Sequence, residues 1–273
     1  MPDKTTNNFS LVDLPDIPAS LDNAMKNLTN KPTKKIGDTL ADAWFLVFGG
    51  LSHKASQRRM QYAHDLERYE KELTESISKI PENERLEPSI QVTAQALENS
   101  KYCISSNELR RMFVYLITNT MDNRYESFTH PSFPEIIKQM SPLDARILSS
   151  FKNKVSQPIA NIVLNHRSGT RKTLERYIFF EINGSYSYPY AASISSLERL
   201  GLLSVDFSTQ LADKSLYDLF TKFSYYGHLK DIFENKESGD FLGTINGICE
   251  ITPLGIHFIK SCIPETLRFL QIP

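Results

Sequence analysis

Residues 194–203 read Ile-Ser-Ser-Leu-Glu-Arg-Leu-Gly-Leu-Leu, and they predict a helix that ends and runs directly into a strand. Gly201 is the residue type that most often follows the last turn of a helix, and the segment 202–207 favours extended structure. A second stretch, residues 248–258, reads Ile-Cys-Glu-Ile-Thr-Pro-Leu-Gly-Ile-His-Phe and predicts a strand followed by a helix. Thr252 is the expected cap of that helix, and Pro253 suits its first turn. The C-terminal part of the chain therefore combines helices with strands.

The order of these elements resembles a winged helix. A helix is expected to begin at Ser141-Pro142, where the serine can cap it and the proline fits the first helical position. About 40 residues separate the two predicted strands, and loops of that length without structure are uncommon, so we expect an extra helix near residues 216–223. The helix 192–201 offers few side chains for reading bases. A winged helix used for protein contact and one used for DNA are both open.

The N-terminal part predicts helices alone. Apolar residues recur at helical spacing within 32–80, which indicates one long helix or two in sequence. Further helices are expected at 88–99, at 107–121 with Ser105 or Ser106 as cap, and at 132–140. The fold class is mainly α, with a helical domain of long helices followed by a winged-helix-like α+β domain. We place a mobile tail at residues 1–31, the helical domain at 32–140 and the second domain at 141–273.

Residues 87–151 contain a series of short runs, which are Glu87-Pro88, Ala96-Leu97-Glu98, Tyr102, Glu108-Leu109-Arg110, Met112-Phe113, Met121-Asp122, His130-Pro131-Ser132-Phe133, Ile136-Ile137-Lys138-Gln139-Met140, Ser141-Pro142 and Asp144-Ala145. In these runs the segment resembles the abortive infection alpha family of bacterial phage-defence proteins. The resemblance implies a part in aborting phage infection, and it implies no catalytic chemistry that can be carried over to this chain.

Six residues within the resemblance are candidates for binding a partner: Glu108, Arg110, His130, Pro131, Ser132 and Phe133. The last four could form a contact loop, or a buried polar site with Asp122 and Arg124. The alternative is a helix entry, in which Ser132 and Glu135 form a capping box. For Glu108 and Arg110 the alternative is an ion pair inside the domain.

The most apolar run of the chain lies at residues 43–51 and carries Trp44, Phe45, Val47, Phe48 and Leu51. It is apolar all round, which predicts that it has no solvent face. It is much shorter than the roughly 20 residues that cross a bilayer. A buried core helix, a subunit interface and contact with an anionic membrane surface all fit this run.

The charge balance argues against a protein that coats nucleic acid by charge alone. The chain has 31 Lys and Arg against 32 Asp and Glu, a net charge of −1. One basic cluster stands out and could touch phosphate if the protein binds nucleic acid at all; it consists of Arg167, Arg171, Lys172 and Arg176. We therefore expect protein partners or self-association, with weak nucleic acid binding and peripheral membrane contact as alternatives and no small-molecule substrate.

No catalytic signature is visible in the sequence. The six histidines show no metal-ligand spacing, and there is no nucleophile elbow, phosphate-binding loop or dinucleotide motif. The three cysteines form no CxxC pair, which fits a reducing compartment, and no secretion signal is present. We therefore expect a cytoplasmic protein without enzymatic activity, metal or cofactor.

Overall fold

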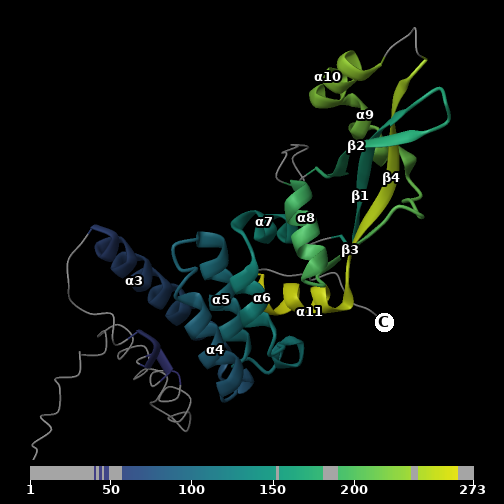
Figure 1. Cartoon of the computed structure of the whole chain (residues 1–273). Coiled ribbons are helices and arrows are strands. Elements are labelled where there is room, and N and C mark those ends of the chain that lie inside the picture. The colour runs from purple at the N-terminus through teal and green to yellow at the C-terminus, as the bar shows by residue number, and fades with distance from the viewer. Residues whose placement is uncertain are drawn as a thin grey trace, which may run out of the picture.

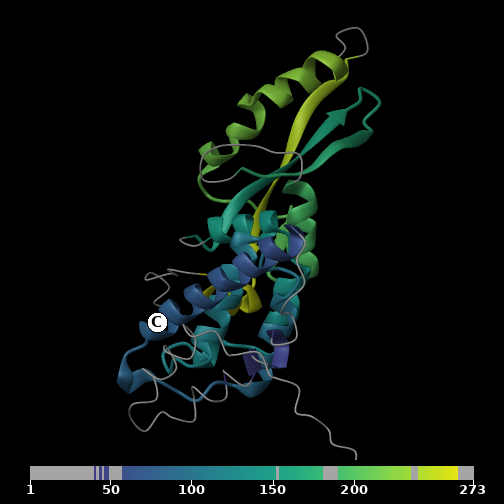
Figure 2. The ribbon, with the colours of Figure 1, turned by 90° about the vertical axis from the view of Figure 1, so that its left-hand side faces the viewer.

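The computed structural model describes residues 40, 43–44, 46–48, 57–151, 154–180, 190–234 and 239–263 (Figure 1). The expected tail at 1–31 lies outside these residues. The described chain forms a body of packed helices, from which a sheet with its own helical layer extends (Figures 1 and 2).

The body follows the predicted order of helices. Its elements are α3 (Gln57–Ser78), the 3-10 turn η2 (Glu82–Glu84), α4 (Ile90–Ser100), α5 (Asn107–Asn119), the 3-10 turn η3 (Glu126–Phe128), α6 (Phe133–Gln139) and α7 (Pro142–Ser150). Ser106 caps α5 by accepting from the Leu109 N–H, and Ser141 with Asp144 forms a full capping box on α7. Before residue 141 the described chain contains no strand, and its extended pairing is limited to one isolated bridge between Arg85 and Asp122. The mainly helical character of this part is confirmed.

A four-stranded antiparallel sheet follows, in the order β2-β1-β4-β3. Its strands are β1 (Ser156–Asn165), β2 (Arg171–Ile178), β3 (Leu203–Asp206) and β4 (Phe241–Ile251). The strands β3 and β4 match the two stretches quoted above. The hairpin β1–β2 was not expected, and it makes the sheet twice as wide as the sequence predicted.

The helices of this part also lie where expected. Helix α8 (Tyr190–Arg199) is followed by Gly201, whose φ of +73° is the left-handed conformation that glycine adopts more readily than other residues. Helix α11 (Pro253–Cys262) begins at Thr252, whose hydroxyl accepts from the Gly255 N–H. The long connection from β3 to β4 contains η4 (Lys214–Tyr217), α9 (Leu219–Lys222) and α10 (Ser224–Phe233).

Two apolar clusters hold these layers together. The larger one runs from α3 through α7 to α8, the near ends of β3 and β4, and α11. The smaller one lies between the outer part of the sheet and the η4–α9–α10 layer, and includes Ile162, Leu164 and Phe220. We call the part around the smaller cluster the arm: it comprises β1, β2, η4, α9, α10 and the first half of β4. Figure 2 shows the arm extending away from the helical body.

The fold is thus a mixed α+β structure with an all-helical first part. The winged-helix resemblance of the second part, and the domain boundary at residue 141, stay predictions. Helix α11 packs against α5, so the two parts share one continuous apolar core in the described chain.

Candidate functional site

The loop with His130, Pro131, Ser132 and Phe133 leads into α6. The Ser132 side chain makes no capping bond to α6, so the expected capping box is wrong. Its hydroxyl oxygen instead lies 2.7 Å from His130 Nδ1, and the Ser132 N–H donates to the same nitrogen over 3.1 Å. The imidazole thus accepts the Ser132 N–H that Glu135 would accept in a capping box. His130 and Pro131 are exposed, whereas Phe133 is fully buried.

Aromatic contacts fasten this loop to α11. The Phe133 ring meets Phe258 edge to face, with 5.0 Å between centroids. Phe128 packs against His257 in the same manner at 5.3 Å, and the Lys260 ammonium lies 4.1 Å above the Phe128 ring. Much of the loop is therefore occupied by contacts within the chain.

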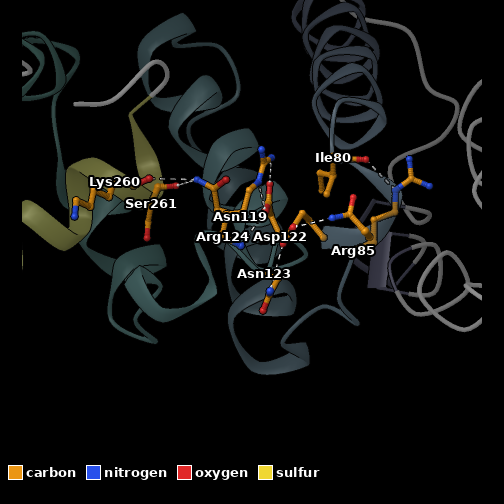
Figure 3. A network of polar contacts seen from close by, with 10 residues as sticks. Ile80, Arg85, Asn119, Asp122, Asn123, Arg124, Lys260 and Ser261 are labelled. Carbon is orange, nitrogen blue, oxygen red and sulfur yellow. Dashed lines mark hydrogen bonds and ion pairs between the residues drawn. The ribbon is translucent and has the colours of Figure 1, made fainter. Parts of the chain in front are cut away.

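Polar contacts join the same region to the end of α5 and to the segment around η2 (Figure 3). Asn119 at the end of α5 donates to the carbonyl oxygens of Lys260 and Ser261 in the last turn of α11, at 3.4 and 2.9 Å. Asp122 is buried, and its carboxylate accepts from Arg124 Nε and Nη2 at 2.9 and 2.6 Å. Two backbone groups of the α5–α6 loop also pair with the segment before α4: the Asn123 N–H donates to the Glu84 carbonyl, and the Met121 carbonyl accepts from the Leu86 N–H. This network orders the loop from both sides.

Arg110 and Glu108 lie at the start of α5 but have different surroundings. Arg110 has no exposed surface, and its guanidinium forms a paired contact with Glu72 of α3 at 3.1 and 2.9 Å. It also donates to the Ile104 carbonyl and to Asn107 Oδ1. Glu108 is half-buried and accepts a bond from the Ser106 hydroxyl at 3.2 Å. Arg110 is thus an internal connection between α3 and α5, away from any surface that a partner could reach.

The apolar run at 43–51 packs partly into the body. Trp44 and Phe48 are each 4% exposed, and their rings contact Tyr69 of α3. Val47 is half-buried, whereas Leu46 is 81% exposed. The expectation that this run has no solvent face is therefore wrong. Phe45 and Leu51 lie outside the described residues.

The basic cluster lies on the arm. Arg167 is in the turn between β1 and β2, and Arg171, Lys172 and Arg176 are on β2, an edge strand of the sheet. All four side chains are exposed. Successive residues of a strand point to opposite faces, so Arg171 and Lys172 project from opposite sides of the hairpin.

Where α8 meets the sheet, Tyr177 and Glu198 form a hydrogen-bonded pair that was not predicted from the sequence. Tyr177 has a φ of +54°, a strained value for a residue with a side chain. Its N–H donates to Asn161 Oδ1, its hydroxyl donates to Glu198 Oε2 at 3.2 Å, and its ring stacks on Phe207. Burial raises the pKa of the Tyr177 hydroxyl, and the charge of Glu198 adds to the increase. The positive φ depends on tertiary packing, so no local signal could have found it.

Comparison with known families gives one decisive match. The model of the family described as abortive infection alpha matches residues 61–262, which include the body, the arm and α11. The chain belongs to the abortive infection alpha family. No curated protein and no solved structure matches it.

The match covers more of this abortive infection alpha protein than the short runs at 87–151 that carried the resemblance. It includes the hairpin β1–β2 and the α9–α10 layer, so the arm belongs to the region that the family model matches. The HPSF loop and α11, which contact each other, also lie inside it.

Reactive groups are scarce in the described part of this family member. Among those residues, no three His, Cys, Asp or Glu side chains lie close enough to hold a metal ion. Cys103, Cys249 and Cys262 are buried, and burial raises the pKa of each thiol, which makes them poor nucleophiles. No described helix combines the length and apolar character of a membrane span.

Proposed function

We propose that this protein acts in abortive infection through protein contacts made by the arm, without catalysis of its own. The supporting observation is the distribution of exposed apolar side chains. Four of the large ones lie within 26 residues of the arm: Leu216, Leu219, Ile232 and Phe241, which are 41, 50, 56 and 57% exposed. Single exposed apolar residues are ordinary, whereas a concentration of them marks an interaction surface.

The helices of the arm explain why these residues face water. Tyr217 and Phe220 point into the smaller cluster, and the Tyr217 hydroxyl donates to the Gly247 carbonyl of β4 at 3.0 Å. The short η4–α9 segment is thereby fixed on the sheet, and Leu216 and Leu219, three residues apart, share another side of it. Ile232 and Phe241 flank the connection from α10 to β4. An apolar surface on a held scaffold suits a protein partner or a second copy of the chain.

A cytoplasmic location belongs to the same proposal, because a defence protein that meets phage components does so after their entry. The buried cysteines suit a reducing compartment.

Site-specific photo-crosslinking tests the proposal. A photoreactive residue is placed at Leu219 on the arm and, as a matched control, at Tyr102 on the body, which is 75% exposed. During infection we expect a protein adduct at 219 and none at 102. A second photoreactive residue at Ile232 should also form an adduct with the partner. The double change Leu216→Asp and Leu219→Asp should abolish that adduct, and it should abolish phage resistance.

Phage resistance that survives this double change in a folded protein would refute the role of the arm. The body variant Ile90→Asp with Tyr102→Asp alters two exposed apolar residues outside the arm. The body variant should retain phage resistance. The proposal would also be contradicted if the body variant lost resistance while the arm variant kept it.

A further inference from the structure

The β1–β2 hairpin carries an unusual concentration of uncompensated positive charge. Residues 167–176 contain four basic residues and one acidic residue, in a chain whose net charge is −1. In the described part of the chain, none of the four cations pairs with a carboxylate. Arg171 donates to Asn165 Oδ1, a neutral partner.

Two other exposed lysines of the arm pair with carboxylates, and a third has a neutral partner. Lys222 pairs with Asp218 at 2.7 Å, Lys230 lies 3.8 Å from Glu234, and Lys214 donates to Gln210. The one acidic residue of the hairpin segment, Glu175, accepts a 2.6 Å bond from the Tyr225 hydroxyl of α10. Its carboxylate is therefore bonded to the helical layer. The four basic side chains of the hairpin are exposed to solvent.

The turn that holds Arg167 is fixed in place. The Asp240 carboxylate accepts from the Arg167 N–H at 3.1 Å and lies 3.1 Å from His166 Nδ1. Backbone bonds from His166 to Thr170 and from Gly169 to His166 close the turn. Residues 167–172 are all exposed, and the hairpin projects from the molecule (Figure 2). A rigid, projecting basic ribbon loses little entropy when it binds a polyanion.

We propose that the β1–β2 hairpin binds the phosphate backbone of duplex DNA. Because β1 also pairs with β4 from Ser156 to Asn165, the hairpin is a ribbon covered on its β1 side, and it can enter the ~12 Å wide major groove of B-form DNA only by its β2 edge. Because Arg171 and Lys172 project from opposite faces, a hairpin in the groove directs cations toward both of its walls, with Arg167 at the tip. The deep, narrow major groove of A-form RNA does not admit such a ribbon.

Helix α8 is the other element that could enter a groove, but its contacts make it less suited than the hairpin to bind DNA. Three of its polar side chains are bonded to other parts of the chain: Ser196 donates to Asp144, Glu198 accepts from Tyr177, and the exposed Arg199 donates to Gln139. The hairpin, in contrast, offers its cations to solvent. The binding is to phosphates and carries no base specificity of its own.

Fluorescence anisotropy of the full chain with a labelled duplex of mixed sequence tests the proposal. With four phosphates contacted, the slope of log K against log salt should be about −3.6, which is a loss of roughly 100-fold between about 50 and 200 mM salt. Replacing Arg167, Arg171, Lys172 and Arg176 with Ala should reduce affinity at low salt at least tenfold and bring the slope near zero.

A charge-matched control changes Lys154, Lys214, Lys222 and Lys230 to Ala, exposed lysines outside the hairpin. It should keep the affinity of the wild type, and the variant Arg167→Lys with Arg171→Lys and Arg176→Lys should keep most of it. The proposal fails if wild type does not bind duplex DNA at low salt, or if both Ala variants lose affinity equally. It also fails if duplex RNA, poly-glutamate or phosphatidylserine vesicles bind the hairpin more tightly than DNA does.

Discussion

At the scale of single residues, Arg110 is the clearest case of a charge used for structure. Its guanidinium has no exposed surface and joins Glu72 of α3 to the Ile104 carbonyl and Asn107 at the start of α5. Because the planar guanidinium bonds several groups at once, lysine cannot replace it.

We therefore expect Arg110→Ala to lower the free energy of unfolding by about 3 kcal/mol, since it leaves buried partners without a donor. Arg110→Lys should be nearly as harmful. The neighbouring Arg111 is exposed, so Arg111→Ala should change stability by no more than about 0.5 kcal/mol. Urea unfolding followed by circular dichroism measures all three. Equal effects at positions 110 and 111 would contradict the internal role of Arg110.

The burial of Tyr69 allows a prediction of how the free energy of unfolding depends on pH. It lies on α3, is completely buried and contacts the rings of Trp44 and Phe48, and burial raises the pKa of its hydroxyl well above the usual value. In the unfolded chain it ionises near pH 10. Above that pH the unfolded state binds fewer protons than the folded state, so stability falls as pH rises.

The change Tyr69→Phe should make that alkaline decline shallower, by up to about 1.4 kcal/mol per pH unit between the unfolded and folded pKa values. Stability near pH 7 and near pH 11 is compared by urea titration in the two proteins. An identical pH dependence would show that Tyr69 is not protected in the folded state.

At the scale of elements, the helix starts were predictable and the hairpin was not. Ser106 and Ser141 mark their helices by local chemistry, so their caps are found from neighbouring residues. Strand β1 contains Pro158, and proline argues against a central strand. It is tolerated because β2 ends opposite Ala160 and does not reach Pro158. Two register shifts between β1 and β2 further disturb the alternation that marks a strand.

The features of the candidate sites also divide into those that the sequence predicts and those that it does not. The exposure of the basic residues on β2 follows from their type. The burial of Arg110 depends on Glu72, 38 residues away, and the exposure of Leu216 and Leu219 depends on which side of η4–α9 meets the sheet. Such features need the tertiary structure.

Substitution of two glycines, Gly255 of α11 and Gly227 of α10, tests how these helices are placed. A Cβ on Gly255 would overlap the Leu202 carbonyl oxygen, so α11 packs directly on the backbone before β3. Gly227 lies on the exposed side of α10, where an added Cβ would have no other atom within 4 Å. We expect Gly255→Ala to destabilise the protein by about 2 kcal/mol or more, as overpacking does.

Gly227→Ala should instead stabilise it by up to about 1 kcal/mol, because alanine has the higher helix propensity. Thermal unfolding of both variants measures the difference. A stable Gly255→Ala protein would mean that α11 does not approach Leu202 so closely.

At the scale of the whole molecule, α11 connects the sheet to the helical body. It follows β4 of the sheet, packs on α5, and has its last carbonyls held by Asn119. The arm is thereby anchored to the body while its hairpin and its exposed apolar residues remain available. This arrangement suits the action through protein contacts that we propose for this family member.

The most direct test counts infected cells that release phage. Cells that carry the wild-type protein should release phage from far fewer infected cells than cells without it, and those infected cells should themselves die. The folded arm variant Leu216→Asp with Leu219→Asp should restore phage release to the level of cells without the protein. Full protection by this arm variant, or survival and regrowth of the infected wild-type cells, would contradict the account.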